Sequence, residues 1–500
     1  MKILLVYPKY PDTFWSFKHA LQFISKKALY PPLGLLTVAA MLPAAWEQKL
    51  IDLNVAPLHE HDLAWADYVF LSAMVVQKQS AREIITRCQK AGVKIVAGGP
   101  LFTSEHEDFT GVDHFVLNEA ELTLPRFLAD LQTGRPQHLY TTPEFPAITS
   151  TPPPRWDLVT LKHYASLNIQ YSRGCPFNCE FCDITVLYGH HARVKQTSQI
   201  VAELEGLYVQ GWRGAVLFVD DNFIGNKRAL KQELLPAIMA WMQRRNYPFT
   251  FTTEASINLA DDEPLMRLMV QAGFTSVFVG IETPEEESLA ECAKIQNKHR
   301  DMVASVKKMQ QIGLRVDGGF IVGFDHDGPS IFERQIEFIR NSGIITAMVG
   351  LLNAPRGTRL YHRIIKEDRL VQDSSGDNTD CSTNLIPKMG LETLLKGYQR
   401  IISGIYAPQP YYARVKQFLQ DYRPLEKTAW QFRLRDIRLP SDLFGALFKS
   451  IVLLGIQDKD RRHFWKLFFW SLCRRPQHFS LAITYAIYGY HFRKVFANYL

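Results

Sequence analysis

The sequence has few cysteines and no long hydrophobic run. Seven cysteines occur among 500 residues, and four of them, Cys88, Cys292, Cys381 and Cys473, are scattered along the chain. This odd, scattered set excludes a dense disulfide framework and is typical of a reducing compartment. No stretch reaches the roughly 18 apolar residues that a transmembrane helix needs, and the apolar run within residues 1–8 is too short for a secretory signal. We therefore expect a cytoplasmic protein.

Charge and aromatic residues are concentrated toward the end of the sequence. The formal net charge is +7, and residues 411–500 contain 16 Lys and Arg against 6 Asp and Glu, with 20 Phe, Tyr and Trp. Such a segment is typical of a helical cap packed on a neighbouring domain, of an interfacial membrane surface, or of an RNA-binding surface. We favour the cap and keep peripheral contact with the inner face of the membrane as the alternative. No nucleic-acid partner is expected.

Residues 1–135 alternate between strand and helix patterns. Five apolar runs are separated by helical segments, which predicts an α/β fold with a doubly wound, Rossmann-like parallel sheet. The runs lie at 3–7, 49–52, 68–72, 93–97 and 114–117. Ligands of such sheets bind beyond the carboxyl ends of the strands. The candidate binding residues at those ends are Pro8, Asp52, Asn54, Ser72, Gly98, Gly99 and Pro100.

The rest of the chain divides into three further parts. Residues 136–157 are rich in proline and predict a linker. Residues 158–370 contain six more strand patterns with helices between them, which predicts a second α/β domain. These strands are expected at 167–171, 215–219, 249–253, 276–280, 316–322 and 347–352. Residues 371–500 predict a mainly helical, aromatic and basic domain.

Three cysteines lie within eight residues, directly after the first strand of the second domain. Cys175, Cys179 and Cys182 have the spacing C-x3-C-x2-C. A [4Fe–4S] cluster usually receives four thiolates from the protein, so this motif would leave one iron open to a small molecule. Two other interpretations are a structural zinc site with His190 or His191 as a fourth ligand, and buried thiols that bind nothing.

The cysteine motif resembles that of the radical S-adenosylmethionine (SAM) enzymes. In that family the methionine part of SAM binds the open iron, the six βα units form a partial (β/α)6 TIM-like barrel, and flavodoxin or ferredoxin supplies electrons. After the cysteine motif, the residues at the strand ends resemble the family's segments in the same order, for example Gly280-Ile281-Glu282. Asp221 or Asn222 has a structural alternative to binding SAM, which is to cap the N-terminus of a helix. The resemblance implies that SAM is held by Phe181, Asp220, Asp221, Glu254, Ser256, Gly280, Glu282, Gly319 and Gly323.

The N-terminal segment resembles the cobalamin-binding domain that precedes the barrel in many of these enzymes. The likeness lies in Tyr30-Pro31-Pro32-Leu33-Gly34-Leu35, in Gly98-Gly99-Pro100 and in the domain order. The D-x-H-x-x-G signature, whose histidine binds cobalt, is absent, so we expect cobalt without a protein histidine ligand. The alternative is a corrinoid-like fold that has lost its ligand. Over the whole chain, the sequence is most similar to the subgroup that includes the hopanoid C-2 methylases.

The resemblance implies a cobalamin-dependent methyltransferase that acts on an unactivated carbon of a hydrophobic substrate, such as a lipid, terpenoid or tetrapyrrole. A second interpretation keeps the same cofactors but assigns a cyclisation or oxidation without methylation. A third, an RNA-modifying methylthiotransferase, usually needs three more cysteines in the N-terminal domain, where this sequence has only Cys88. The sequence identifies no catalytic side chain.

Overall fold

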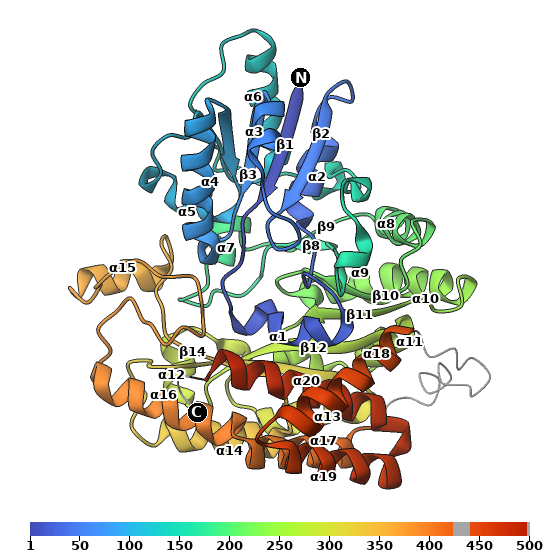
Figure 1. The fold of residues 1–500 in the computed structure, drawn as a ribbon. Coiled ribbons are helices and arrows are strands. Elements are labelled where there is room, and N and C mark those ends of the chain that lie inside the picture. Colours follow the sequence, from blue (N-terminus) through green and yellow to red (C-terminus); the bar gives the residue numbers. More distant parts are fainter. Residues whose placement is uncertain (424–440, 498–500) are drawn as a thin grey trace.

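The computed structural model describes residues 1–423 and 441–497. Two parallel sheets lie one above the other in Figure 1, with the N-terminal domain at the top, the second sheet below it, and the C-terminal helices at the base. No helix in these two ranges is both long and apolar enough to cross a membrane.

The N-terminal sheet is parallel throughout, with the order β2-β1-β3-β4-β5-β6. This is a doubly wound sheet: β2 is added on one side of β1 and β3 on the other, so the topological switch point lies between β1 and β3. The strands are β1 (Lys2–Tyr7), β2 (Glu47–Asp52), β3 (Tyr68–Ser72), β4 (Lys94–Gly98), β5 (His114–Val116) and β6 (Leu139–Tyr140). The last of them lies inside the segment expected to be a linker, where it pairs with β5 as a short edge strand.

Helices cover both faces of this sheet because its strands are apolar on both sides. Along β1, Ile3 and Leu5 join one buried cluster, whereas Leu4 and Val6 join the other. The first cluster includes residues of α2 (Leu33–Met41) and α6 (Ala120–Gln132). The second includes residues of α3 (Glu60–Trp65), α4 (Lys78–Ala91) and α5 (Pro100–Glu105).

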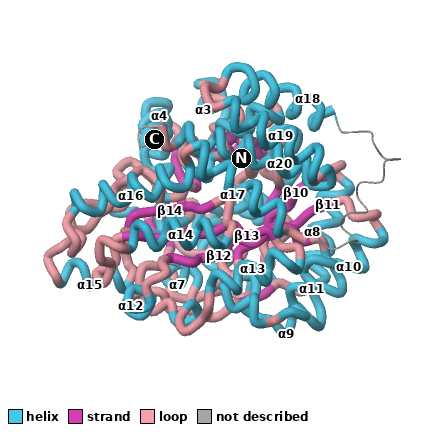
Figure 2. The backbone as a smooth tube through the Cα atoms, turned by 90° about the horizontal axis from the view of Figure 1, so that it is seen from below, coloured by secondary structure: helices cyan, strands magenta, loops and turns pink. Residues whose placement is uncertain are grey.

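The second sheet is the predicted partial barrel. Its six parallel strands stand in sequence order, from β7 through β10–β13 to β14. They are β7 (Leu167–Ile169), β10 (Gly214–Phe218), β11 (Phe249–Glu254), β12 (Phe274–Glu282), β13 (Arg315–Val322) and β14 (Ala347–Leu351). Figure 2 shows strands of this sheet enclosed by helices. The covering helices include α8 (Thr197–Val209), α10 (Leu235–Arg244), α11 (Glu263–Ala272), α13 (Met302–Ile312) and α14 (Ile331–Ser342).

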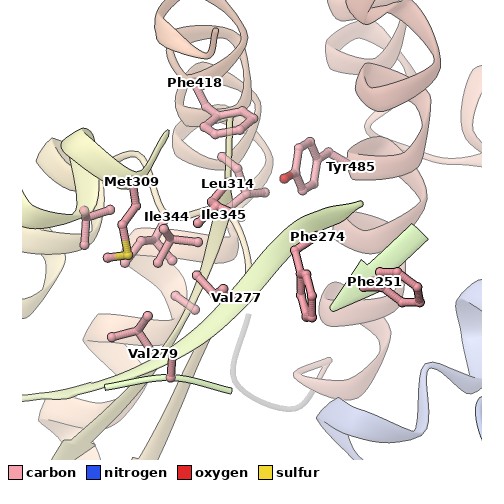
Figure 3. Close-up of a cluster of buried hydrophobic side chains, with 14 of the residues drawn as sticks. Phe251, Phe274, Val277, Val279, Met309, Leu314, Ile344, Ile345, Phe418 and Tyr485 are labelled. Carbon is pink, nitrogen blue, oxygen red and sulfur yellow. The ribbon is translucent and has the colours of Figure 1, made fainter. Parts of the chain in front are cut away.

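The C-terminal helices share the core of the barrel. Phe418 and Tyr485 pack beside strand residues such as Val277 in one buried cluster (Figure 3). Tyr406 extends this contact, since its hydroxyl donates to the carbonyl of Ala347 over 2.7 Å. The helices are α16 (Leu391–Tyr406), α17 (Pro408–Asp421), α18 (Ser441–Ser450), α19 (Arg461–Arg474) and α20 (Phe479–Val495). They therefore form an integral part of the fold.

Candidate functional site

The three cysteines lie in a loop closed by a short antiparallel ribbon. The ribbon pairs β8 (Ser172–Arg173) with β9 (Arg193–Val194), and the loop contains α7 (Ile184–Tyr188). At the base of the loop, Gly174 has φ +91°, and a Cβ there would lie 2.5 Å from the carbonyl oxygen of His191. Only glycine fits such a position. The amide of Cys175 donates to the carbonyl of Gly189, which draws the two sides together.

The thiols fit a buried cluster better than an isolated metal ion. Cys179 is buried, and Cys175 and Cys182 are half-buried. Burial raises the pKa of each of these thiols, so a bound metal is needed to hold them as thiolates. Within the described ranges, no three His, Cys, Asp or Glu side chains surround a single-ion site. His190 and His191, the ligands that the zinc interpretation requires, are exposed.

Asp220 holds the backbone that leads into the cysteine loop. Its carboxylate accepts hydrogen bonds from the amide of Tyr171 and from both the amide and hydroxyl of Ser172. Burial raises the pKa of Asp220 to about 6 in spite of these donors. Because its oxygens accept these hydrogen bonds, Asp220 supports the loop, and its contact with SAM stays a prediction.

Two other acids keep free binding capacity near the loop. Oδ2 of Asp221 is buried and has no hydrogen-bond partner within the described part of the chain. Burial, and then the charges of Asp220 and Asp183, raise the pKa of Asp221 to about 7. Glu254 is exposed although protein surrounds it closely enough for burial to raise its pKa to about 8. Both acids fit a ligand that brings cationic or hydroxyl groups.

Glu282 ends β12 in a strained conformation next to a lysine. The register shifts between Gly280 and Glu282, and Glu282 has φ +63°. Its carboxylate lies 2.6 Å from Nζ of Lys294. A Cβ at Gly280 would lie 2.4 Å from the Glu282 carboxylate and 2.8 Å from Lys294 Nζ, so a side chain at position 280 would displace the ends of both side chains of this ion pair. The Gly-Ile-Glu segment thus places a buried ion pair at the strand end.

The protein itself occupies the space around three other predicted SAM-binding residues. A Cβ at Gly319 would lie 2.8 Å from the ring of Phe278. At Gly323 it would lie 3.1 Å from Leu394. Ser256 donates to Asn258 over 2.7 Å. Local packing and turn geometry account for these contacts, and binding of the nucleoside by these residues stays a prediction.

Phe181 lies between the cysteine loop and a small apolar cluster. It is half-buried, and its ring centroid is 6.2 Å from that of Phe324. Cys292 belongs to the same cluster, and its carbonyl accepts the amide of Glu180. Phe181, the loop residue directly before Cys182, thus packs against the barrel.

The carboxyl edge of the N-terminal sheet is closed by its own hydrogen bonds. Asp52 Oδ1 accepts from the amide and the side chain of Asn54, and Oδ2 accepts from the hydroxyl of Tyr164. Asn54 and Gln77 both donate to the carbonyl of Pro8. The predicted residues Asp52, Asn54 and Pro8 are therefore brought together, but mainly as partners of one another.

The paired glycines at this edge are required by the protein. A Cβ at Gly98 would lie 2.5 Å from the carbonyl oxygen of Val116, and at Gly99 it would lie 2.4 Å from Ser72 Oγ. Gly99 also has φ +87°, directly before Pro100 at the start of α5. The predicted contact of these glycines with a ligand stays a prediction.

Comparisons with known proteins agree with this architecture. Family models match a B12 binding domain at residues 23–128, the radical SAM superfamily at 169–367, and a domain of unknown function at 358–500. An uncharacterized methyltransferase of Synechocystis sp. is 41% identical over 98% of this chain and 91% of its own. The hopanoid C-2 methylase of Rhodopseudomonas palustris is 32% identical over 87% of this chain and 86% of its own. The chain belongs to the cobalamin-binding radical SAM enzymes.

A solved structure supports the fold of this radical SAM enzyme over its full length. The cobalamin-dependent SAM radical enzyme OxsB, with aqua-cobalamin bound, matches with a TM-score of 0.60 and 15% identity. The match covers 99% of this chain and 80% of OxsB. The doubly wound domain, partial barrel and helical C-terminal region predicted from the sequence are thereby confirmed.

The enzyme's cofactors are a [4Fe–4S] cluster, SAM and cobalamin. When bound, they supply electron transfer, a carbon-centred radical and a methyl carrier. Cys175, Cys179 and Cys182 would hold the cluster, while Asp221 and Glu254 would offer acceptors to SAM. The protein's own part is to keep the thiols in one loop, to orient charged acceptors and to exclude water.

Sequence reasoning missed a lysine and a glutamine beside the cluster loop. Burial opposes the charge of Lys294, but Glu282 and then Cys179 raise its pKa above the ordinary value. Gln296 Nε2 lies 3.9 Å from Cys179 Sγ. A buried cation and an amide donor both stabilise thiolate sulfur. These residues lie more than a hundred positions after the cysteines, and no spacing in the sequence marks them.

Proposed function

We propose that this enzyme is a methyltransferase that adds a methyl group to an unactivated carbon of a hydrophobic substrate. The observation that carries the proposal is the near full-length likeness to a hopanoid C-2 methylase, at 32% identity. The Synechocystis relative is also named a methyltransferase. In this proposal, SAM lies between the cysteine loop, Asp221 and Glu254, and cobalamin lies over the carboxyl edge of the N-terminal sheet.

Apolar side chains near the barrel support a hydrophobic substrate. Trp15 comes from the N-terminal segment and contacts Phe278 of β12 edge-on, with 5.3 Å between the ring centroids. Trp15 is 40% exposed, and Met74, at the carboxyl edge of the upper sheet, is 46% exposed. Large apolar groups that stay accessible beside a candidate site are typical of one that binds an apolar ligand.

Anaerobic turnover with methyl-labelled SAM tests the proposal. The enzyme would be incubated with a lipid extract of its source cell and with reduced flavodoxin or ferredoxin as electron donor. We expect label in a hydrophobic product, and no label when Cys175, Cys179 and Cys182 are all alanine. Formation of 5′-deoxyadenosine together with an unlabelled, altered lipid would replace methylation with a cyclisation or oxidation.

Peripheral contact with an anionic membrane is the second part of the proposal. The α18–α19 face exposes Phe448, Ile456, Phe469 and Leu472. A shallow groove of about 610 Å³ on this face is lined by apolar and basic groups: Gly455, Arg461, Arg462, Trp465, Lys466 and Phe469. Apolar rings among cations fit a lipid surface with anionic head groups.

The cap interpretation accounts for only one side of α19. Phe464 and Leu467 are buried, as a cap requires, but Phe469 is 57% exposed. Trp465 is half-buried and donates from Nε1 to the carbonyl of Gly455 over 2.9 Å. The helix therefore attaches to the fold through one face and presents Phe469 and Leu472 on another.

Liposome flotation tests the membrane contact separately from catalysis. With vesicles containing phosphatidylserine, we expect flotation at low salt that falls by more than half at high salt, because exposed charges are screened. Phe469→Asp should abolish it, whereas Phe464→Leu, at a buried position, should not. Absence of flotation at low salt would leave α19 as a structural cap. Methyl transfer to a dispersed substrate would then still stand.

A further inference from the structure

The ribbon that closes the cysteine loop is held by acids of the N-terminal domain. β8 contributes Arg173 and β9 contributes Arg193, and the two residues stand opposite each other in the ribbon. Arg173 lies 2.6 Å from Glu119, and Arg193 lies 2.6 Å from the other oxygen of the same carboxylate. Arg173 also lies 2.9 Å from Glu121. One carboxylate thus bridges both sides of the loop.

The acids belong to a rigid part of the upper domain. Glu119 directly precedes α6 and Glu121 is in its first turn, where the helix dipole favours negative charge. Their side chains are only 3% and 5% exposed. Burial opposes ionisation of Glu121, but Arg173 lowers its pKa below the ordinary value. The four side chains therefore form a buried ionic network between the two domains.

Further hydrogen bonds restrict both arginines. Arg173 Nε donates to Gln170 over 2.8 Å. Arg193 donates to the carbonyl of Pro146 over 2.6 Å and to that of Tyr188, inside the loop, over 3.0 Å. Thr151 donates to Glu121 over 2.6 Å. These hydrogen bonds hold each guanidinium in one orientation, in addition to its charge attraction to the acids. A planar guanidinium is suited to such bidentate or bridging contacts.

The geometry points to Glu119 as a positioning residue for the iron–sulfur cluster. Through Arg173 and Arg193 it fixes the cysteine loop against the cobalamin-binding domain, so the cluster and the second cofactor keep one relative placement. Glu121 reinforces the Arg173 side. This inference depends on the cysteine loop and on the shared interface. It applies equally to a methylating and a non-methylating enzyme.

The chain contains a matched control for this network. Lys195, two residues after Arg193, lies 2.5 Å from Glu203 of α8, and the two side chains are 3% and 1% exposed. That pair is at least as buried as the network and lies within the barrel. Glu203→Gln therefore removes one charge from a buried ion pair next to the ribbon without touching the contact between domains.

Hydrogen exchange in the cluster-free protein tests the inference without catalysis. For Glu119→Gln we expect amides of residues 174–192 to exchange about tenfold faster or more, because two half-buried arginines lose their shared partner. Glu203→Gln should leave exchange in that loop within about twofold of the unchanged protein, with its effect confined to α8 and β9. Equal loop exchange in the two variants would overturn the inference.

The reconstituted cluster supplies a spectroscopic readout. We expect Glu119→Gln to retain its full iron content but to show a changed electron paramagnetic resonance spectrum of the reduced cluster with SAM. Glu203→Gln should give the unchanged spectrum. If Glu119→Gln does not fold, Arg193→Lys keeps the charge but cannot reach Glu119, Pro146 and Tyr188 together, and should give about threefold faster loop exchange. Unchanged exchange and an unchanged spectrum in Arg193→Lys would also refute the role of Glu119.

Discussion

The carboxyl edges of the two sheets meet across one interface, but they differ in how far their polar groups are hydrogen-bonded within the protein. On the barrel side of the described structure, Asp221 has a buried oxygen without a hydrogen-bond partner and Glu254 is exposed. On the N-terminal side, Asp52 and Asn54 are engaged with each other and with the backbone. The Arg356–Asp108 ion pair, at 3.0 Å, joins the two edges.

This difference indicates two modes of cofactor binding. Unsatisfied carboxylates on the barrel side gain partners when a small charged ligand arrives, so charge decides its affinity. The closed edge above has fewer polar groups to offer, so we expect it to bind cobalamin through its shape and backbone. Cobalamin retention should therefore be less sensitive than SAM binding to the loss of a single side chain.

The largest effect is expected at the cysteines. Changing Cys175, Cys179 and Cys182 together to alanine should remove the about four irons of a [4Fe–4S] cluster and all cleavage of SAM. Iron analysis and the absorbance of anaerobically reconstituted protein measure this. Cys473→Ala, at an exposed cysteine far from the loop in sequence, is the control and should keep its iron. Full iron content in the triple variant would contradict the assignment.

Two neighbouring aspartates should respond to substitution with opposite signs. For Asp221→Asn we expect SAM to bind about 10- to 100-fold more weakly, because a charged acceptor is lost. The cofactor-free protein should instead become more stable by roughly 1–3 kcal/mol at pH 8. Asp220→Asn should destabilise it, since three donors lose their carboxylate partner.

The pH dependence of this gain follows from the raised pKa of Asp221. The ordinary pKa is 3.8 and the folded value is about 7. Below the ordinary value both states are protonated, so the variant and the unchanged protein should be equally stable. The advantage of Asp221→Asn should grow as pH rises toward 7 and then stay constant. Denaturant unfolding from pH 4 to 8 measures it, and an advantage that shrinks with rising pH would contradict the buried environment of Asp221.

Substitution at the carboxyl edge of the N-terminal sheet should lower the stability of the protein itself. Gly99→Ala places a methyl near Ser72 Oγ at φ +87°, and should cost roughly 1–3 kcal/mol of unfolding free energy. Adding Ser72→Ala should recover the part due to the contact but not the part due to backbone strain. Loss of cobalamin retention with no change in stability would show instead that the ligand fills the space beside Gly99.

The sequence predicted what depends on local pattern. All six barrel strands and the first five strands of the upper sheet follow from apolar runs, and the cysteine motif marks its own chemistry. The ribbon β8–β9, with two residues in each strand, is too short to give such a pattern. Its partners Glu119 and Lys294 come from distant segments, so only the tertiary fold brings them to the cysteine loop.

Glycines give an ambiguous signal for the site. A glycine shows that a Cβ is not tolerated, but not which atom excludes it. At Gly98, Gly99, Gly319 and Gly323 protein atoms lie close to where a Cβ would stand, and the resemblance implies cofactors beside the same glycines. Asp220 shows the same limitation for acids, because an engaged carboxylate and an available one look alike in sequence.

The smallest effect is expected at a single hydrogen bond between the domains. Tyr164 donates to Asp52 over 3.1 Å, and it is the segment leading into the barrel that presents this hydroxyl to the upper sheet. Tyr164→Phe should cost about 0.5–1.5 kcal/mol of unfolding free energy, with cobalamin retention within about twofold of the unchanged enzyme. Because burial raises the pKa of Asp52 and this hydroxyl lowers it, the loss should be greatest at neutral pH, where the carboxylate is charged, and smaller near pH 4. A large drop in cobalamin retention would show that Asp52 reaches the ligand, and the contrast between the two edges would no longer hold.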